Sequence, residues 1–139
     1  MRLDRDACRA RMASARVARL ATTGQDQRPH IVPITFAVSG EFLVTAIDQK
    51  PKSTLDLRRL RNIAANPYVA VLCDHYADDW SQLWWVRADG QARVVDGEPA
   101  RGAAIAALRE KYPPYRSDPP RGPVIRVAVE SWSGWAFTE

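Results

Sequence analysis

A short basic stretch, Lys50-Pro51-Lys52-Ser53-Thr54, holds the residues of this chain best suited to binding a ligand. Ser53 is a common helix-capping residue type, and Asp56 follows at the spacing of a capping box, with Asp in place of Glu or Gln. The sequence therefore predicts a helix that begins at Ser53. Because free N–H groups and the positive dipole end of a helix favour anions, the two lysines just upstream predict a phosphate or carboxylate site.

The helix predicted after this stretch has a basic face. Leu57 and Leu60 belong to its apolar stripe, and three arginines lie mostly off that stripe: Arg58, Arg59 and Arg61. The formal net charge of +4 agrees with a surface that attracts anions mildly. Lysines and arginines are spread along the chain without a nucleic-acid motif, so a small anionic ligand is favoured over nucleic acid. An ordinary solvated basic loop is the alternative.

Motifs for chemistry performed by the protein's own side chains are absent from the sequence. It lacks the glycine-rich phosphate-binding motifs and the Gly-x-Ser-x-Gly pattern of serine hydrolases. The adjacent Asp78 and Asp79 are more typical of a solvated turn than of an acid/base pair. His30 and His75 have no partner at a metal-site spacing. Such a chain either binds a ligand or takes its chemistry from a cofactor.

The elements that must position these residues follow from the apolar pattern. We expect helices at residues 4–15, from Ser53 to Asn66-Pro67, and at 100–111, and strands at 17–23, 29–38, 42–47, 68–76, 83–95 and from 124 to 129 or beyond. Consecutive hairpins with few helices favour a small antiparallel barrel over an alternating parallel sheet. The length fits a single domain over residues 1–139.

Two local features constrain this barrel. Pro33 lies inside a strand pattern and lacks an N–H, so its strand is bulged there or lies on an edge. Trp84 and Trp85 are neighbours in a strand, so their side chains point to opposite faces. One indole must then lie outside the barrel, and dimerisation is our preferred explanation over cover by a helix of the same chain.

Composition indicates a cytoplasmic protein. No apolar run approaches the roughly 20 residues that span a bilayer, and the N-terminus is too charged for a secretory signal. Cys8 and Cys73 are then expected to be buried free thiols.

Taken in order, these segments resemble the flavin/deazaflavin split β-barrel superfamily. The resemblance covers nearly the whole chain and is carried by residues 29–36, 48–52, 57–63, 66–70 and 84–92. More narrowly, the chain is similar to the actinobacterial coenzyme F420-dependent oxidoreductases of the pyridoxamine 5′-phosphate oxidase-like class. The resemblance implies a mainly β fold, a six-stranded antiparallel Greek-key split barrel of the FMN-binding type with flanking helices. It also implies a homodimer with a cofactor at the subunit interface.

The same resemblance assigns roles to residues of this chain. The phosphate-binding loop would consist of Lys50, Lys52, Ser53 and Thr54. The phosphate or an extended anionic tail would be held by Arg58, Arg59 and Arg61. Residues beside the tricyclic ring would be Pro33, Ile34, Thr35, Thr45, Ala46 and Ile47. The strand contributed by the partner would carry Trp84, Trp85 and Arg87.

Coenzyme F420 carries a phosphate and an oligoglutamate tail, which suits the surplus of Lys and Arg better than FMN does. The implied function is hydride transfer from C5 of the reduced deazaflavin to an electron-poor organic substrate. The alternatives are an FMN-binding oxidoreductase of the same fold and a non-catalytic F420 carrier. A proton could come from solvent, Tyr76, His75 or Tyr112, and the residues Trp80, Trp132 and Trp135 are candidates for the substrate wall or for core packing. The sequence does not identify the substrate, and it contains no metal site.

Overall fold

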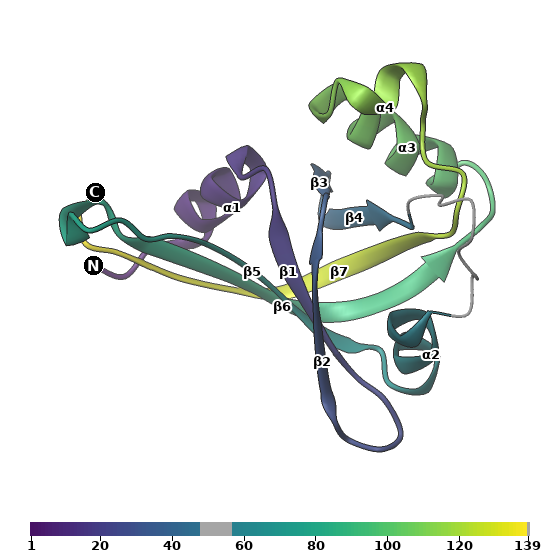
Figure 1. Cartoon of the computed structure of the whole chain (residues 1–139), viewed down its shortest axis with the longest axis horizontal. Coiled ribbons are helices and arrows are strands. Elements are labelled where there is room, and N and C mark those ends of the chain that lie inside the picture. The colour runs from purple at the N-terminus through teal and green to yellow at the C-terminus, as the bar shows by residue number, and fades with distance from the viewer. Residues whose placement is uncertain (48–56, 139) are drawn as a thin grey trace.

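The computed structural model describes residues 1–47 and 57–138 (Figure 1). The elements along the chain are α1 (Arg5–Ser14), β1 (Ala18–Thr23), β2 (Pro29–Ile34), β3 (Ala37–Ser39), β4 (Phe42–Ala46), α2 (Arg58–Ala65), β5 (Tyr68–His75), the 3-10 turn η1 (Trp80–Gln82), β6 (Trp84–Val95), α3 (Ala100–Lys111), α4 (Pro114–Ser117) and β7 (Val124–Ala136). Three of the expected boundaries are confirmed closely. Asp4 caps α1 by accepting from the Ala7 N–H at 2.8 Å, α3 spans the predicted residues, and β7 continues past residue 129.

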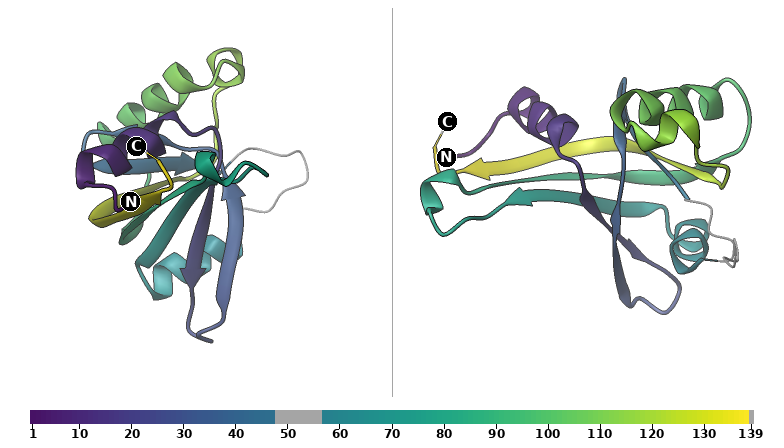
Figure 2. Two further views of the ribbon diagram at one scale, coloured as in Figure 1. Left: turned by 90° about the vertical axis from the view of Figure 1, so that its left-hand side faces the viewer. Right: turned by 45° about the horizontal axis from the view of Figure 1, so that its top comes forward.

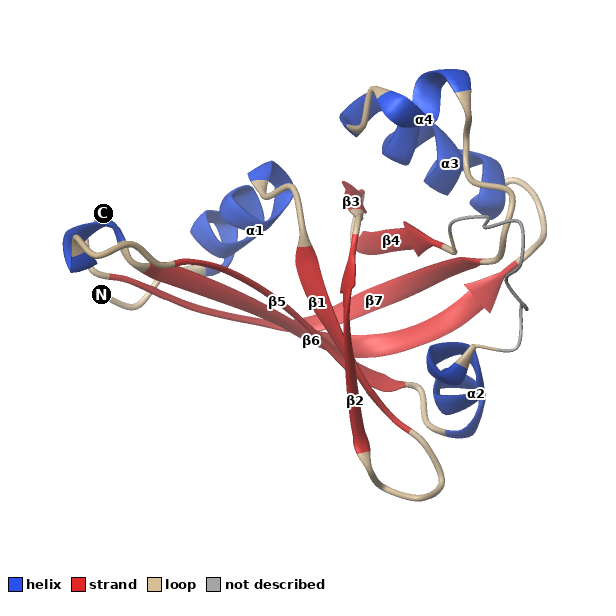
Figure 3. Ribbon diagram, viewed as in Figure 1, coloured by secondary structure: helices blue, strands red, loops and turns tan. Residues whose placement is uncertain are grey.

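The described strands form one curled antiparallel sheet in the order β2-β1-β5-β6-β7-β4-β3 (Figure 3). β5, β6 and β7 are consecutive neighbours, and β1 joins the sheet through β5 while β4 joins it through β7. The long strands β6 and β7 run through the whole molecule and carry both chain termini at one end (Figure 2).

The expectation of six strands is wrong, since the described residues contain seven. Residues 29–38 were expected as one strand, but β2 ends at Ile34 and β3 begins at Ala37. β2 pairs with β1 at one end of the sheet order, and β3 pairs with β4 at the other. A straight strand cannot serve both edges of a curled sheet, so the ladder is interrupted at Thr35 and Phe36. These two residues join the two edges covalently.

Pro33 lies on the edge strand β2, as its missing N–H predicts, and the β1–β2 register runs through it without a bulge. The bulge occurs instead between β6 and β7, where the register shifts at Asp89 and Gly90. A Cβ on Gly90 would collide with the Ala128 carbonyl, so this close approach of two backbones requires glycine.

The interior of the curled sheet is a single apolar cluster. Phe36, Met12 and Leu20 are among its largest fully buried side chains. α1 contributes Met12, and α2 contributes Ile63. Each of these helices buries one apolar face against the concave side of the sheet, which is why both are amphipathic.

A second cluster lies on the outer side of β3, β4 and the start of β7. Val44 and Val124 pack there against Ala104 and Leu108 of α3. α3 and α4 therefore cover one part of the outer face, above β3 and β4 in Figure 1. The part formed by β2, β1 and β5 has no helix over it among the described residues. None of the described helices has both the length and the apolar character to cross a membrane.

Candidate functional site

Thr35 and Phe36, the residues between β2 and β3, are held by side chains from distant parts of the chain. The Thr45 hydroxyl on β4 donates to the Thr35 carbonyl at 2.7 Å. The Phe36 N–H donates to the Tyr112 hydroxyl at 3.1 Å, and the Tyr115 hydroxyl lies 2.7 Å from Thr35 Oγ1. Side-chain hydroxyls thus take the place of ladder hydrogen bonds where the strand is broken.

This break contains the first group of residues predicted to lie beside a ring. Pro33 is exposed on the outer face, Ile34 is buried in the interior cluster, and Thr35 is half-buried between them and α4. Thr35 therefore lies where the part of the outer face covered by α3 and α4 meets the uncovered part.

The second predicted group lies on and just after β4. The structure brings Thr45 to Thr35 through the hydrogen bond described above. Ala46 packs in the cluster under α3, and Ile47 packs in the interior cluster. The Ile47 N–H is also occupied, because it donates to the Pro123 carbonyl at 2.9 Å. The side chains of Ala46 and Ile47 therefore serve packing.

The predicted anion loop, formed by Lys50, Lys52, Ser53 and Thr54, lies outside the described residues. The expected start of the helix at Ser53 is wrong for α2, which begins at Arg58 after an extended Leu57. Leu57 packs against the interior cluster, and this contact favours the extended backbone at that position. The cap residue Leu57 offers no side-chain acceptor, so none of the residues that the structure describes caps the first N–H groups of α2 by a side chain. Such N–H groups favour an anion.

The three arginines of α2 differ in what they contact. Arg58 donates to Asp26 at 2.7 Å, so its charge is already neutralised. Arg61 is exposed and lines a shallow pocket of about 320 Å³ with Arg58 and Asn62. Arg59 is half-buried, and this burial lowers its pKa. Within residues 1–47 and 57–138, no ion pair or hydrogen bond of the Arg59 guanidinium is recorded, which makes it the arginine most suited to hold an anion.

Trp84 and Trp85 lie on opposite faces of β6, as predicted. Trp84 packs against the interior cluster, with the Arg11 guanidinium 5.3 Å from its ring centroid. Trp85 lies on the outer face, opposite Asp74 of β5 and Trp135 of β7.

The third residue predicted on this strand, Arg87, follows two positions after Trp85 on the same face. Its Nε donates to Asp89 at 3.0 Å. Trp84 is therefore engaged by its own subunit, whereas Trp85 and Arg87 face outward.

Several large apolar side chains are exposed on the uncovered part of the outer face. Ile31 on β2 is 62% exposed, Tyr76 beyond β5 is 64% exposed, and Phe137 beyond β7 is 50% exposed. By strand register Ile31, Pro33, Trp85 and Trp135 share one face, and the Phe137 ring contacts that of Trp135. Together with Tyr76, which follows β5 directly, we call them the outer apolar patch: Ile31, Pro33, Tyr76, Trp85, Trp135 and Phe137. Patches of this kind mark interaction surfaces.

Lys111, at the end of α3, has a buried amine. Its Nζ is buried without a recorded hydrogen-bond partner in the described chain and lies 3.8 Å from the centroid of the Phe36 ring. Burial lowers the pKa of Lys111 to about 8, and the nearby Arg16 acts in the same direction. Cys73 lies close by, and its burial raises the pKa of that thiol to about 11.

Other side chains considered for chemistry have structural roles or lie free in solvent. Asp79 caps η1 by accepting from the Ser81 N–H at 3.0 Å, which confirms the turn interpretation, and bonds from Ser81 lower its pKa. Tyr76 and His75 are exposed, and the Tyr112 hydroxyl is occupied by Phe36 and by the Arg16 carbonyl. No group of three or more potential metal ligands occurs among the described residues.

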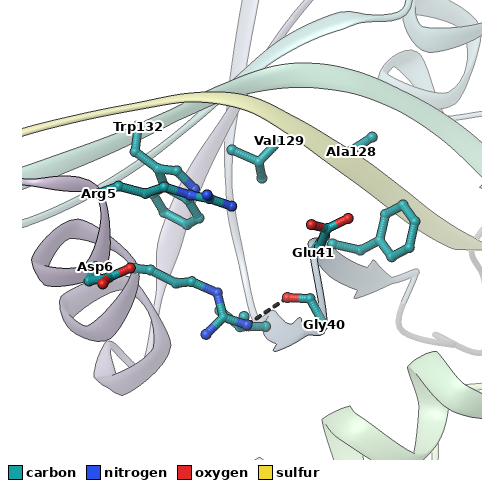
Figure 4. A pocket seen from close by; sticks show the side chains of 10 residues that line it. Arg5, Asp6, Gly40, Glu41, Ala128, Val129 and Trp132 are labelled. Atoms are coloured by element: carbon teal, nitrogen blue, oxygen red, sulfur yellow. Dashed lines mark hydrogen bonds between the residues drawn. The ribbon is translucent and has the colours of Figure 1, made fainter.

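A larger cavity of about 440 Å³ lies between the start of α1, the β3–β4 turn and β7 (Figure 4). Arg5 and Trp132 line it, and Arg9 donates to the Gly40 carbonyl at 2.6 Å across it. Of the residues predicted to hold the cofactor, none lines this cavity, although Trp132, a candidate for the substrate wall, does. We therefore base the candidate site on the three places that carry the predicted residues: the β2–β3 break, the start of α2 and the outer face.

Tyr115 is the residue of this site that the sequence reasoning missed. Its proline-rich surroundings, with Pro113-Pro114 just before it, indicated an irregular connection, yet residues 114–117 form α4. The tyrosine itself was the signal that could have pointed to a contact here, because a tyrosine hydroxyl usually finds a hydrogen-bond partner when it is buried.

The protein is thus a curled antiparallel sheet with flanking helices. Its interrupted edge strand, the basic helix α2 and the uncovered outer face are the parts suited to bind a ligand. Residues 4–136 match the family model described as pyridoxamine 5′-phosphate oxidase. The chain therefore belongs to the pyridoxamine 5′-phosphate oxidase family.

Solved structures similar to this chain support the fold. A conserved hypothetical protein from Mycobacterium tuberculosis has a TM-score of 0.79 at 19% identity, with 97% of this chain and 86% of that chain covered. An FAD-binding protein from Mesorhizobium loti has a TM-score of 0.70 at 22% identity, with 96% and 95% covered. The heme storage protein HutZ from Vibrio cholerae has a TM-score of 0.69 at 18% identity, with 93% and 89% covered. No curated protein matches the chain.

Proposed function

We propose that the protein is an oxidoreductase that binds coenzyme F420 between the subunits of a homodimer. Its reaction is hydride transfer from the reduced cofactor to an electron-poor organic substrate. The observation that carries the proposal is the half-buried Arg59 guanidinium, which has no recorded partner in the described chain, at the start of α2, where the cap residue Leu57 offers no side-chain acceptor. A desolvated guanidinium is costly without an anion, and a cofactor phosphate is such an anion.

The residues present fit a phosphorylated tricyclic cofactor. The N–H groups that open α2 and the Arg59 side chain suit its phosphate, and the sequence adds Lys50 and Lys52 just upstream. The break at Thr35 offers polar groups beside the exposed, apolar Pro33, as a flat ring with polar edges requires.

The protein's own contribution to the reaction is binding and orientation. When bound in reduced form, the deazaflavin would supply the hydride. Thr35 and Thr45 fix the backbone at the break, which holds the ring-facing surface rigid. A second subunit over the outer face would exclude water and hold the substrate in a reactive orientation.

Coenzyme F420 is preferred over FMN because its oligoglutamate tail adds carboxylates that the arginine-rich helix can pair with. FMN stays the alternative, since one similar structure is named an FAD-binding protein. Titration of the purified protein with each cofactor, followed by tryptophan fluorescence, tests the choice. Binding of F420 at micromolar or lower concentration supports the proposal, whereas tight FMN binding without an F420 response refutes it.

The role of Arg59 is tested in the same titration with Arg59→Gln. Loss of a charge-assisted contact should weaken cofactor binding by about 10- to 100-fold. Arg121→Gln is the matched control, because the Arg121 side chain is 71% exposed and its one recorded ion pair within the described residues is a 3.8 Å contact with Asp118. Equal affinity of the Arg59 variant and the control would remove Arg59 from the site.

The homodimer is proposed from the outer apolar patch. A second copy placed over it would cover Trp85 and Ile31 and would give the indole on the outer face a packing partner. Sedimentation velocity of the protein tests this directly, and a monomer at tens of micromolar would contradict it.

Catalysis is separated from simple cofactor carriage by a substrate panel. The protein is mixed with reduced F420 and a series of enones, quinones and tetrapyrroles, and oxidation of the cofactor is followed by absorbance. Turnover with any of them supports an enzyme, while tight cofactor binding with no turnover supports the carrier alternative.

A further inference from the structure

The three hydroxyls around the β2–β3 break do not perform the same task. Those of Thr45 and Tyr112 bond backbone groups, the Thr35 carbonyl and the Phe36 N–H. The Tyr115 hydroxyl contacts Thr35 Oγ1 at 2.7 Å. Its removal would leave no buried backbone group unpaired, so its contribution to folding is small.

One hydroxyl hydrogen of the Thr35–Tyr115 pair is not used in the hydrogen bond between the two side chains. Two hydroxyls carry two hydrogens, and one of them closes the bond between the pair, whichever oxygen donates. For the second hydrogen, no acceptor is recorded among the described residues. Both side chains are only half-buried, so this donor can reach a ligand.

The position of the pair indicates which kind of ligand group it would bind. Thr35 lies two residues after the exposed Pro33, at the boundary between the part of the outer face under α4 and the uncovered part. The Tyr115 ring packs edge-on against the Tyr112 ring, with centroids 5.6 Å apart, and this contact fixes the direction in which the Tyr115 phenol points. A fixed hydroxyl donor on a half-apolar surface favours an acceptor on a flat, polar-edged molecule.

We propose that the Thr35–Tyr115 hydroxyl pair is a binding contact for the cofactor ring and donates its free hydrogen to a carbonyl oxygen of the pyrimidinedione part. Flavins and deazaflavins share these carbonyls, so the contact serves either cofactor. This inference rests on the proposed function, and it adds α4 to the elements that build the site.

The test is a double-mutant cycle read by cofactor affinity and by the absorption spectrum of the bound cofactor. Tyr115→Phe and Thr35→Val each remove one hydroxyl and keep the shape of the side chain. Each should weaken binding by about 5- to 10-fold and shift the spectrum at saturation, with melting temperatures within about 3 °C of the wild type. If the pair acts as a unit, the double variant binds no more weakly than the weaker single variant.

Ser14→Ala is the control, because Ser14 is exposed at the end of α1, away from the candidate site, and its hydroxyl donates to the Arg11 carbonyl of the same helix. It should leave affinity and spectrum unchanged. Wild-type affinity and spectrum in Tyr115→Phe, or strictly additive losses in the double variant, would overturn the inference while the proposed function stands. A wild-type protein that binds neither F420 nor FMN would overturn both.

Discussion

Replacing Lys111 with methionine should stabilise the folded protein. Methionine keeps most of the volume and flexibility of the lysine side chain and removes the buried amine. The Lys111 Nζ has no recorded hydrogen-bond partner in the described chain, and burial lowers its pKa from 10.5 to about 8. Folding therefore has to overcome the cost of burying the charged form at neutral pH.

The size of the gain follows from this pKa. Each unit of pKa is worth about 1.4 kcal/mol, so a fall from 10.5 to about 8 bounds the cost at roughly 3 kcal/mol. Partial exposure of the side chain reduces that figure. The ammonium also gains about 1 kcal/mol from the Phe36 ring, whose centroid lies 3.8 Å away. We expect Lys111→Met to raise the free energy of unfolding by about 1–2 kcal/mol at pH 7.

The gain should disappear as the pH rises. Below about pH 8 the amine is protonated in both states, and the folded state carries the full cost. Between about 8 and 10.5 the unfolded chain binds more protons than the folded one, so the wild type gains stability and approaches the variant. Cys73 and Tyr112 have raised pKa values and act in the opposite direction at high pH. The difference between the two proteins therefore isolates Lys111 better than either curve alone.

Urea unfolding at pH 7, 8, 9 and 10 measures this difference. Glu110→Met is the control, because Glu110 is the exposed neighbour on the same helix and its replacement should change stability little at every pH. A Lys111→Met protein no more stable than wild type at pH 7, or a difference that stays constant up to pH 10, would refute the reasoning.

Three further predictions concern other parts of the chain. Lys52→Ala, in the sequence-predicted loop outside the described residues, should weaken cofactor binding by about 1–3 kcal/mol in the fluorescence titration, and unchanged affinity would exclude Lys52 from the site. Ile31→Arg should convert the dimer to a folded monomer in sedimentation velocity, whereas Ala106→Arg on the exposed side of α3 should not. Gly90→Ala should lower the free energy of unfolding by about 2 kcal/mol or more because its Cβ meets the Ala128 carbonyl, while Gly97→Ala, with open space around it, should have little effect on urea unfolding.

Most of the fold is predictable from local pattern. The missing N–H of Pro33 predicted that its strand is bulged or lies on an edge, and the structure has the edge. The adjacent Trp84 and Trp85 required a strand with two different environments. The cap of α1 at Asp4 was also readable, because its chemistry acts over three residues. These features depend on the apolar periodicity of a segment and on residues a few positions apart, and both can be read from a single sequence.

The broken strand and half of the site were not predictable in this way. Two of the three hydroxyls that hold Thr35 and Phe36 come from residues 80 and 76 positions away, and no local sequence pattern predicts such partners. The pairing of Arg58 with Asp26 joins residues 32 positions apart, so the three arginines of α2 looked equivalent in the sequence. The structure distinguishes them by contact and burial.

The pairing order also has a consequence for synthesis on the ribosome. Both early hairpins, β1–β2 and β3–β4, are complete after the first 46 residues, yet β1 joins the sheet through β5 and β4 joins it through β7. As the chain emerges, the β1–β2 hairpin can pair once β5 is complete at His75, but the β3–β4 hairpin has no strand to pair with until β7 is made at the end of the chain. The apolar surface of the β3–β4 hairpin therefore stays in contact with solvent or chaperones, and a slow stretch of translation late in the message would expose it longest.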